Sequence, residues 1–526
     1  MHGYLALLLH AHLPFVRHPE HENFLEEDWL FEAVAETYIP LLKIFRRLAA
    51  EKVDFCITLT LTPTLCAMLR DPLLQERCAR YMTRGVELAA AEMERMKGDS
   101  AIHDLAKFYH DRFTEAIWFY EKELKRDIVS AFAQLQEDGY VEIIGCAATH
   151  AYLPALESYP EAIRAQIRIG CDEYRECFGR APVGIWLPEC GYLQGLDTFL
   201  QEADIRWFVV DAHGLMYGTP RPRFAIYAPC FTPAGPAVFG RDRDSSKQVW
   251  SSQEGYPGDP AYRDFYRDIG QELPLDYLHR FGPELRHNTG IKYHRITGRN
   301  VSKEVYRRDW ALGAADHHAG DFLRSRIGQI EHLKGMMGVD PLIMSPYDAE
   351  LFGHWWFEGP EFLDLFIRKA AYDQKVFRLT TPTRYLATHP VAQMINPAAS
   401  SWGHKGYGEV WLARENAWIY PHLHAATQRM IDGAKKYAGA PPPSAFEERM
   451  LRQMARELLL AQSSDWAFLI KTGTAKDYAK QRTKDHFLRF TRLHDELLSG
   501  AKSSSILEVC EQRDNLFPNI NWRHFL

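Results

Sequence analysis

The amino-acid sequence predicts an α/β fold in which short buried strands alternate with helices, forming a parallel sheet or a barrel. Three observations predict it: short apolar runs recur as far as residue 346, stretches with helical spacing separate them, and polar residues follow the runs at once. In a barrel, the residues that follow the C-terminal ends of the strands carry the chemistry. The side chains just after the apolar runs are therefore the candidates for a functional site.

The predicted strands are short and bounded by polar or turn-forming residues. They cover residues 4–9, 53–61, 141–145, 183–187, 205–210 and 341–346. His10, His150, Glu189, Asp211 and Asp348 stand at or shortly after the ends of five of these runs.

Helical spacing is clearest in two early stretches. Residues 26–48 place apolar side chains close to every 3.6 positions, and Pro40 predicts a kink or restart there. Residues 72–137 are free of proline after Pro72 and rich in helix formers, with a predicted break at Gly98-Asp-Ser100. This stretch is longer than one barrel helix needs, so it predicts a helical insertion at about residues 72–137.

The second half contains loops and then helices. Residues 220–283 are rich in Gly, Pro, Tyr and Arg and predict long ordered loops, which are often functional in a compact domain. Residues 445–462 and 476–498 have amphipathic helical spacing, and Gly439-Ala-Pro-Pro-Pro443 predicts a turn between helices.

Composition narrows the possible partners and location. The net charge of −7 argues against nucleic acid, and 13 Trp residues suit a protein that stacks on sugar rings. Nine Cys residues without a C-x-x-C pair predict reduced thiols in a cytoplasmic protein. The run Leu5–Leu9 is too short for a signal peptide, and no run of about 18 apolar residues predicts a membrane span.

Two carboxylates stand out. Glu189 lies in Trp186-Leu-Pro-Glu-Cys190 directly after a predicted strand, and Asp348 follows another strand in Ser345-Pro-Tyr-Asp-Ala-Glu350. Cleavage of a glycosidic bond needs such a pair: one group attacks the anomeric carbon or activates water, and the other protonates the leaving oxygen. Glu350 is a rival to Asp348. His354, Trp355 and Trp356 follow closely and form either core or a sugar-binding cluster.

The pair His10 and His12 is the main competing signal, because H-x-H at the end of a first strand is able to bind a catalytic metal. His150, Asp211 and His213 would complete such a site. Alternatively these side chains hydrogen-bond a sugar. No H-E-x-x-H motif supports a metal, so a metal-free site is the favoured interpretation.

Other residues are divided between structure and binding. Trp402, Trp411 and Trp418 lie in or near a Gly-rich loop and either pack there or stack on glucose rings. Arg241, Asp242 and Trp250 either shape a loop or contact the substrate, and the sequence favours neither role over the other. Asp465 and Trp466 follow two serines, a sequence unfavourable inside a helix, which slightly favours a site role.

Five separated blocks, taken together, resemble glycoside hydrolase family 57. They are His10-Ala-His-Leu-Pro14; residues 139–145 running to His150 and Pro154; Trp186-Leu-Pro-Glu-Cys190; Ser345-Pro-Tyr-Asp-Ala-Glu350; and Ser463-Ser-Asp-Trp466. The resemblance implies a distorted (β/α)7 barrel with a helical insertion and a C-terminal helical domain. On that basis residues 1–400 form the catalytic domain, and residues 401–526 form a helical domain that contributes to the active-site cleft.

The resemblance also implies a retaining mechanism without a metal or other cofactor, with Glu189 as nucleophile and Asp348 as general acid/base. The predicted substrate-binding residues are His10, His12, His150, Trp186, Arg241, Asp242, Trp250, His354, Trp355, Trp402, Trp411, Asp465 and Trp466.

Within the family, the chain is most similar to the glycogen (1,4-α-glucan) branching enzymes, a group that includes some α-amylases. We therefore expect an α-glucan substrate, no nucleic acid or membrane partner, and a monomer or small homo-oligomer. The group carries a mobile loop whose Tyr keeps water from the intermediate, and the segment between Asp211 and Trp250 is short for such a loop. An α-amylase-type hydrolase or 4-α-glucanotransferase on the same site is the alternative, and a metal-dependent polysaccharide deacetylase is a more distant one.

Overall fold

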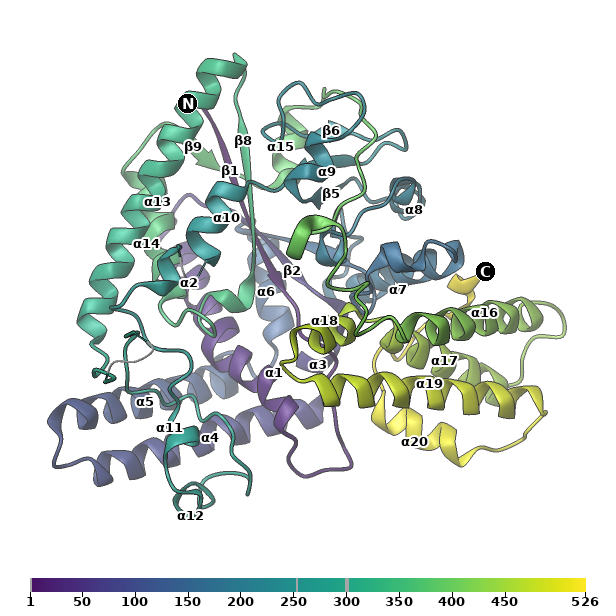
Figure 1. Cartoon of the computed structure of the whole chain (residues 1–526), viewed down its shortest axis with the longest axis horizontal. Helices are drawn as coiled ribbons and strands as arrows, with labels where there is room; N and C mark the ends of the chain where they lie inside the picture. Colours follow the sequence, from purple (N-terminus) through teal and green to yellow (C-terminus); the bar gives the residue numbers. More distant parts are fainter. Residues whose placement is uncertain (1, 252–253, 299–301) are drawn as a thin grey trace.

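The computed structural model describes residues 2–251, 254–298 and 302–526, and its centre is a curved parallel sheet (Figure 1). Seven parallel strands follow one another across this sheet in the order β7-β5-β4-β3-β2-β1-β8. A short strand β6 adds to β7 in the antiparallel direction, and β9 pairs with the start of β1. The strands are β1 (Gly3–Ala11), β2 (Ile57–Leu61), β3 (Val141–Cys146), β4 (Gly184–Trp186), β5 (Trp207–Val210), β6 (Cys230–Phe231), β7 (Ala237–Gly240), β8 (Leu342–Asp348) and β9 (Phe377–Leu379).

The sheet curls toward a barrel without a ladder between β7 and β8 in the described residues. Single backbone hydrogen bonds cross the gap instead: Asp242 N–H, just after β7, donates to the Met344 carbonyl of β8 at 2.8 Å, and Leu342 N–H donates to the Tyr227 carbonyl at 2.8 Å. The predicted distorted (β/α)7 barrel is therefore confirmed.

Strand register brings the predicted functional residues to one end of the barrel. His10 of β1 is paired with Thr60 of β2 on one side and with Asp348 of β8 on the other. Glu189 follows β4 and Asp211 follows β5, both at the same C-terminal edge. Parallel strands thus gather side chains that are far apart in the sequence.

Helices surround the sheet, as a parallel sheet requires on its exposed face. Figure 1 shows α13 and α14 running alongside β8 and β1. The helices that follow barrel strands are α3 (Pro63–Leu69), α7 (Pro160–Phe178), α8 (Leu196–Glu202), α9 (Ala212–Met216), α10 (Arg243–Trp250) and α14 (Gly359–Tyr372), while α2 (Ile39–Ala50), α6 (Ile128–Glu137) and α13 (Arg308–Met337) lead into the next strand.

Near Pro40, where the sequence predicts a kink or a restart, the α-helix is interrupted by a π-helical turn that lies just upstream of the proline. Helix α1 (Asp28–Ala33) runs into a π-helical turn at Val34–Tyr38 before α2 begins. Pro40 lacks the N–H that would bond the Glu36 carbonyl, so the regular ladder is interrupted just before it. The turn points Glu36, Thr37 and Tyr38 into buried positions near the barrel mouth.

The long predicted helical stretch begins with two antiparallel helices, α4 (Pro72–Arg95) and α5 (Ser100–Trp118), at the lower edge of Figure 1, and continues through a π-helical turn at Phe119–Glu123 into α6. The break predicted at residues 98–100 is confirmed. Asp71 caps α4 by accepting from Leu74 N–H at 3.0 Å, and Asp99 caps α5 by accepting from Ile102 N–H at 3.2 Å.

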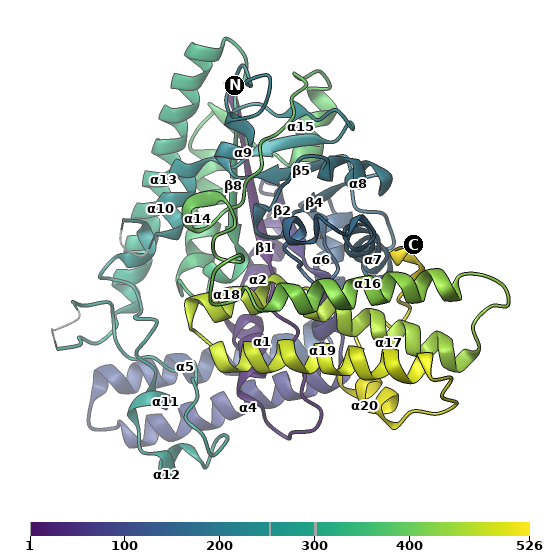
Figure 2. The same cartoon turned by 45° about the vertical axis from the view of Figure 1, so that its right-hand side comes forward.

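The C-terminal residues form a helical layer beside the barrel mouth (Figure 2). It contains α16 (Ile419–Tyr437), α17 (Ala445–Ala461), α18 (Ser464–Thr472), α19 (Lys476–Leu498) and α20 (Ser505–Arg513). The helices predicted at 445–462 and 476–498 are confirmed. The motif Ser463-Ser-Asp465 was read as lying inside a helix, and this was wrong: α17 ends at Ala461, and Ser463 caps the start of α18.

Residues 220–283, predicted as ordered loops, also hold β6, β7, α10 and the one-turn helices α11 (Ile269–Glu272) and α12 (Leu275–Leu278), with residues 252–253 outside the described part. All nine Cys residues are free thiols. Among the described helices, none combines the length and apolar character that a bilayer span requires.

Gly353 is expected to be intolerant of substitution. It has φ of 123°, and a Cβ atom there would stand 1.9 Å from the Glu36 carbonyl oxygen in the π-helical turn. Gly353→Ala should therefore lower the free energy of unfolding by about 3 kcal/mol or more, because backbone must move and the residue must leave its preferred conformation. Thermal denaturation measures this, with Gly313→Ala, where a Cβ meets open space, as the control. Equal melting temperatures for the two variants would contradict it.

Candidate active site

Glu189 lies directly after β4 in a conformation rarely adopted by non-glycine residues, with φ of 62° and ψ of 21°. Its backbone carbonyl accepts a hydrogen bond from Trp402 N–H at 2.8 Å, which helps hold the turn. Such left-handed backbone costs roughly 1–3 kcal/mol and is retained where surrounding contacts fix it, often at functional sites. The turn aims the carboxylate at the barrel mouth.

Two donors hold the Glu189 carboxylate. The indole N–H of Trp402 donates to Oε2 at 2.6 Å, and the Ser464 hydroxyl donates to Oε1 at 2.8 Å. Burial raises the pKa of Glu189 to about 7, although both hydrogen bonds favour the ionised form and oppose the shift. Burial thus favours the protonated form of Glu189, and its two donors favour the ionised form. The same two hydrogen bonds fix the orientation of the carboxyl group.

Asp348 ends β8 and is less enclosed. Among the described residues, no hydrogen bond engages its carboxylate, which leaves both oxygens free for a ligand. Burial raises the pKa of Asp348 to about 6, while the positive charges of Arg241 and His12 oppose the rise. A free carboxyl group that titrates near neutrality is suited to proton transfer.

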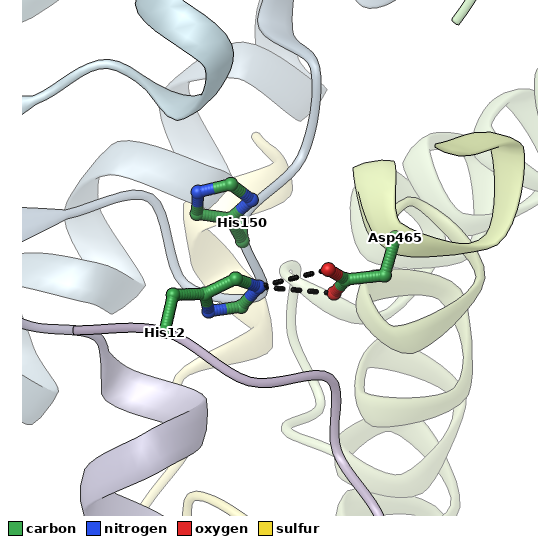
Figure 3. A group of neighbouring side chains, drawn as sticks. All are labelled: His12, His150 and Asp465. Atoms are coloured by element: carbon green, nitrogen blue, oxygen red, sulfur yellow. Dashed lines mark hydrogen bonds and ion pairs between the residues drawn. The ribbon is translucent and has the colours of Figure 1, made fainter. Parts of the chain in front are cut away.

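His12, His150 and Asp465 lie together at this end of the barrel (Figure 3), and His10 lies against His150. These side chains are called the floor of the site. His12 Nε2 lies 3.0 Å from both oxygens of Asp465, and His12 Nδ1 lies 3.0 Å from Thr62 Oγ1. The rings of His12 and His150 are stacked with centroids 3.8 Å apart.

The histidines differ in charge. Burial alone would lower the pKa of His12, but the carboxylates of Asp465, Glu189 and Glu350 outweigh it and raise the pKa above its usual value, which favours the protonated form. Burial and the neighbouring imidazoles lower the pKa of His10 and His150 well below the usual value, which favours their neutral forms. Of the three rings, His12 is therefore the one on which a positive charge is favoured.

His150 uses both ring nitrogens within the site. Its Nε2 lies 3.0 Å from His10 Nε2, and its Nδ1 lies 2.9 Å from the Ser464 hydroxyl that in turn donates to Glu189. This chain fixes the orientation of Ser464. His10 also stacks on the buried Trp186, with centroids 4.8 Å apart.

Glu350, the rival to Asp348, is held in a closed environment. The Tyr38 hydroxyl donates to Oε1 at 2.5 Å, and His12 N–H donates to the same oxygen at 3.2 Å. Burial raises the pKa of Glu350 to about 8. Because two donors hold Oε1 of Glu350, this residue suits a positioning role, whereas the carboxyl group of Asp348, which no hydrogen bond in the described residues engages, is better placed to give up a proton.

Asp211 does not join the histidine cluster. Its carboxylate contacts His213 Nδ1 at 3.1 Å, Arg243 Nη2 at 3.0 Å and Arg241 Nη1 at 3.5 Å. Two guanidinium groups make this a poor metal site. The predicted alternative of a deacetylase metal held by His10, His12 and Asp211 is therefore not supported by the positions of these residues.

A different trio, His12, His150 and Asp465, has ligand atoms within 4.8 Å of one another. However, both nitrogens of His150 already have hydrogen-bonding partners, and the Asp465 carboxylate is paired with His12. A cation would have to displace these contacts. The donor set fits a hydrogen-bonded floor better than a metal centre.

Arg241 and Trp402 form one wall. The guanidinium carbon of Arg241 lies 5.4 Å from the centroid of the Trp402 ring, and Trp402 meets Trp186 edge to face at 5.0 Å. Trp402 is only partly buried, so part of its ring remains available for stacking.

Further out, two predicted binding residues expose aromatic surface. Trp250, at the end of α10, has 48% of its surface exposed, and Trp355 has 53% exposed while its ring is stacked on Phe265. His354 lies behind Trp355 and contacts Glu36 at 3.2 Å through Nδ1. Both indoles keep exposed surface, and the contact of His354 with Glu36 supports the segment that carries Trp355.

Three other predicted binding residues have mainly structural contacts. Trp411 is buried and stacks on Tyr152 at 5.0 Å. Trp466 is buried and donates its indole N–H to the Leu460 carbonyl at 2.7 Å. Asp242 caps α10 and accepts from Gln329 at 2.9 Å. Their surroundings assign them to holding the loop, α18 and α10 in place.

Ser464 and Tyr38 were not singled out from the sequence. Ser464 stood in the noted Ser-Ser-Asp motif, whose poor helix propensity was the available signal. Tyr38 appeared only as part of an apolar helical face, and nothing local distinguished it from a core residue.

The geometry defines a class of site: two carboxylates at the ends of barrel strands, one oriented and one free, among indole and imidazole rings that suit sugars. Such sites cleave glycosidic bonds. Comparison with known proteins agrees. Residues 6–324 match the model of glycosyl hydrolase family 57, and residues 422–525 match the C-terminal region of 1,4-alpha-glucan branching enzymes. The chain belongs to glycosyl hydrolase family 57.

Relatives cover nearly the whole chain. The 1,4-alpha-glucan branching enzyme of Thermococcus kodakarensis is 36% identical over 98% of this chain and 78% of that protein. The solved structure of an alpha-amylase from Thermotoga maritima is 44% identical, with a TM-score of 0.93, covering 100% of this chain and 99% of that one. A branching enzyme structure from Pyrococcus horikoshii is 34% identical, with a TM-score of 0.90, covering 100% and 97%.

Proposed function

We propose that the protein is a 1,4-α-glucan branching enzyme that acts by a retaining mechanism, with Glu189 as nucleophile and Asp348 as general acid/base. One observation carries the proposal. The region that matches branching enzymes supplies Ser464 and Asp465 to the catalytic end of the barrel, where Ser464 donates to Glu189 at 2.8 Å and Asp465 pairs with His12 at 3.0 Å.

In the first half of the proposed reaction, a Glu189 oxygen attacks the anomeric carbon of an α-1,4-linked glucosyl unit. The bond from that carbon to the glycosidic oxygen breaks, and the proton of Asp348 moves to that oxygen as the chain departs. Covalent attachment inverts the anomeric carbon once. The hydrogen-bonded chain from His10 through His150 to Ser464 would hold Glu189 in position during the attack, and Asp465 would hold His12 in place.

In the second half, the 6-hydroxyl of another glucan chain gives its proton to Asp348 while its oxygen attacks the anomeric carbon. The ester bond to Glu189 breaks, and Glu189 leaves as a carboxylate. The second inversion restores the α configuration and yields an α-1,6 branch. Proton NMR of the first-formed products tests the retaining step, because an inverting enzyme acting as a hydrolase would release the β-anomer.

The roles require Glu189 ionised and Asp348 protonated in the enzyme–glucan complex. In the empty site, burial raises the pKa of both, to about 7 for Glu189 and about 6 for Asp348. This order favours a proton on Glu189 before glucan binds. A glycosidic oxygen beside Asp348 accepts a hydrogen bond only from the protonated form, and the donors Trp402 and Ser464 favour the charge on Glu189, so glucan would shift the proton toward Asp348.

Hydrolysis is the second candidate function, because the 44% identical structure is described as an alpha-amylase. Residues 211–250 also contain α9, β6, β7 and α10. The stretch between α9 and β6 is fastened to residue 396 through Thr219 and to β8 through Tyr227. Because these contacts hold the stretch in place, few residues remain to form a loop that covers Glu189. Water would then reach the glycosyl intermediate and compete with the 6-hydroxyl as acceptor.

Incubation of amylose with the purified protein decides between the two. Branching gives new α-1,6 signals in the proton NMR spectrum with few new reducing ends. A rise in reducing ends without α-1,6 signals would overturn branching and support the amylase reading. Full activity after chelation and dialysis would argue against the more distant deacetylase alternative.

Ser464→Ala is expected to change the pH dependence of the reaction. Loss of the 2.8 Å hydrogen bond removes a contact that favours ionised Glu189, so the pKa of Glu189 rises further. Because the free enzyme already favours a proton on Glu189, kcat/KM should fall about tenfold on the acid side and nearly as much at its maximum, while the alkaline side stays unchanged. The matched control is Ser463→Ala, whose hydroxyl donates to Asp465 at 2.5 Å. Identical acid limbs in wild type and Ser464→Ala would contradict this assignment.

The substrate class follows from the proposal, with amylose, glycogen and maltooligosaccharides as donors or acceptors. A cytoplasmic location stays a prediction that rests on the composition of the chain and its nine cysteines. The oligomeric state, monomer or small homo-oligomer, is also a prediction, and size-exclusion chromatography with light scattering measures it.

A further inference from the structure

A second cavity lies away from the catalytic carboxylates. Its volume is about 400 Å³, within the usual range for small-molecule sites. It is bounded by residues 21–31 at the start of α1, by one face of α4 and by the loop at residues 281–289. Figure 1 shows α1, α4 and α12 gathered in this part of the molecule. The helical run that begins at Asp28 continues through the π-helical turn to Tyr38, which contacts Glu350. That run is roughly 15 Å long, which separates the cavity from Glu350 along the helix.

The walls of this cavity are fixed by buried polar contacts. Arg77 donates to both oxygens of Glu27 at 2.8 and 2.6 Å, and Glu27 also accepts from His18 N–H at 2.8 Å. On the opposite side, the buried Asp268 accepts from Gly270 N–H, Thr289 N–H, the Thr289 hydroxyl and Gly290 N–H at 2.8 to 2.9 Å. The cavity is therefore preformed.

Its surface combines aromatic rings with polar groups of both charges. Tyr81 and Phe281 contribute rings from α4 and from the loop. Arg84 donates to Asn23 at 3.0 Å through Nη1, and Arg80 donates to the Glu22 carbonyl at 2.9 Å, which leaves further N–H groups on each guanidinium. Asp28 lines the same cavity, and no hydrogen bond or ion pair within the described ranges uses its carboxylate. Burial raises its pKa to about 7, as expected for a carboxylate without a compensating partner.

The carboxylate and the guanidinium groups of the cavity together favour a neutral ligand over an anion or a metal cation. A phosphate or other anion would meet the carboxylate of Asp28, and a metal cation would meet Arg80 and Arg84. A neutral polyhydroxyl ligand satisfies all of these groups at once, because each hydroxyl both donates and accepts. Sugar rings also present apolar faces that stack on aromatic side chains. The lining therefore fits a carbohydrate better than a charged ligand.

We propose that this cavity is a second, non-catalytic binding site for a segment of α-glucan, held by Asp28, Arg84, Tyr81 and Phe281. The identity of the sugar rests on the proposed function of the catalytic site, while the polyhydroxyl class rests on the lining alone. Such a site would retain a long polymer between catalytic events and would add little for a chain too short to reach it.

Binding without turnover tests the proposal. In a Glu189→Gln background, isothermal titration with maltoheptaose is expected to show two classes of site. Adding Asp28→Asn or Phe281→Ala should weaken one class at least tenfold and leave the other within twofold. Trp402→Ala should weaken the class that the first two variants spare. The matched control is Asp54→Asn, an exposed carboxylate outside the cavity, which should change neither class.

Two further measurements distinguish a loss of binding from a loss of folding and from a failure of the proposed function. Asp28→Asn removes a buried carboxylate with a raised pKa, so its melting temperature at pH 8 should equal or exceed that of the parent. Amylose turnover by the wild type tests the proposed function independently. A single binding class that Trp402→Ala weakens and Asp28→Asn and Phe281→Ala leave unchanged would overturn the second site, even if amylose is turned over. Saturable binding of inorganic phosphate that maltoheptaose does not displace would also overturn it.

Discussion

Glu189→Gln is expected to lower kcat on amylose by roughly 10⁴-fold or more, because an amide cannot form or release the glycosyl ester. The substitution preserves shape. The amide oxygen is able to accept from Trp402, and the amide N–H₂ is able to donate to the Ser464 oxygen, so both contacts at 2.6 and 2.8 Å have a substitute. We therefore expect the variant to fold and to bind maltoheptaose with an affinity close to that of the wild type.

The measurement is the rate of α-1,6 linkage formation or of reducing-end release, whichever the wild type shows. Glu350→Gln is the matched control, since it removes a nearby buried carboxyl group that is bonded to Tyr38 and His12. We expect about a tenfold loss there, as for a positioning residue. Retention of more than about a tenth of wild-type activity by Glu189→Gln, in a folded sample free of deamidation, would remove Glu189 from the nucleophile role.

Asp348→Asn is expected to lower kcat on amylose by about 10²- to 10⁴-fold, the usual contribution of a general acid/base. The size of the loss should depend on the leaving group. A glucan chain needs a proton in order to leave, whereas 4-nitrophenolate does not. With a 4-nitrophenyl maltooligosaccharide the first step should be nearly unaffected, and the second step, which lacks its base, should become limiting.

A burst of 4-nitrophenol followed by slow turnover is therefore the expected signature of Asp348→Asn. The pH profile gives a second readout. In the wild type, activity should fall at acid pH as Glu189 gains a proton and at alkaline pH as Asp348 loses its own, giving a bell whose limbs lie near the raised pKa values of about 6 and 7. The variant should lose the alkaline limb. An equal loss on both substrates, with the bell unchanged, would assign Asp348 a structural role.

The sequence predicted the barrel strands well because each is a compact apolar run that ends in a polar residue. It missed β6 and β7, which lie within the Gly- and Pro-rich residues 220–283 that predict loops, and β9, a three-residue strand with a central Arg. Pro40 predicts a disturbance of the helix but not its π-helical form, because those hydrogen bonds depend on what Glu36 and Tyr38 contact elsewhere in the fold.

The site was predictable to the extent that its residues stand at strand ends. Glu189, Asp348, His10 and His12 fall in that group. The contact between Ser464 and Glu189 joins residues 275 positions apart, and the pair His12 and Asp465 is separated by 453. Only the packing of α18 against the barrel mouth creates them. For the same reason the sequence did not distinguish the buried Trp411 and Trp466 from the partly exposed Trp402.

The position of α18 has a consequence for when the enzyme becomes active. A ribosome makes Glu189 and Asp348 long before it makes Ser463, Ser464 and Asp465, and until α18 docks, Glu189 lacks one of its two hydrogen-bond donors and His12 lacks its carboxylate. A nascent or truncated chain would then hold a complete barrel with little power to cut glucan. Activity toward α-glucan would therefore begin only after the C-terminal helical layer has been made and α18 has docked on the barrel.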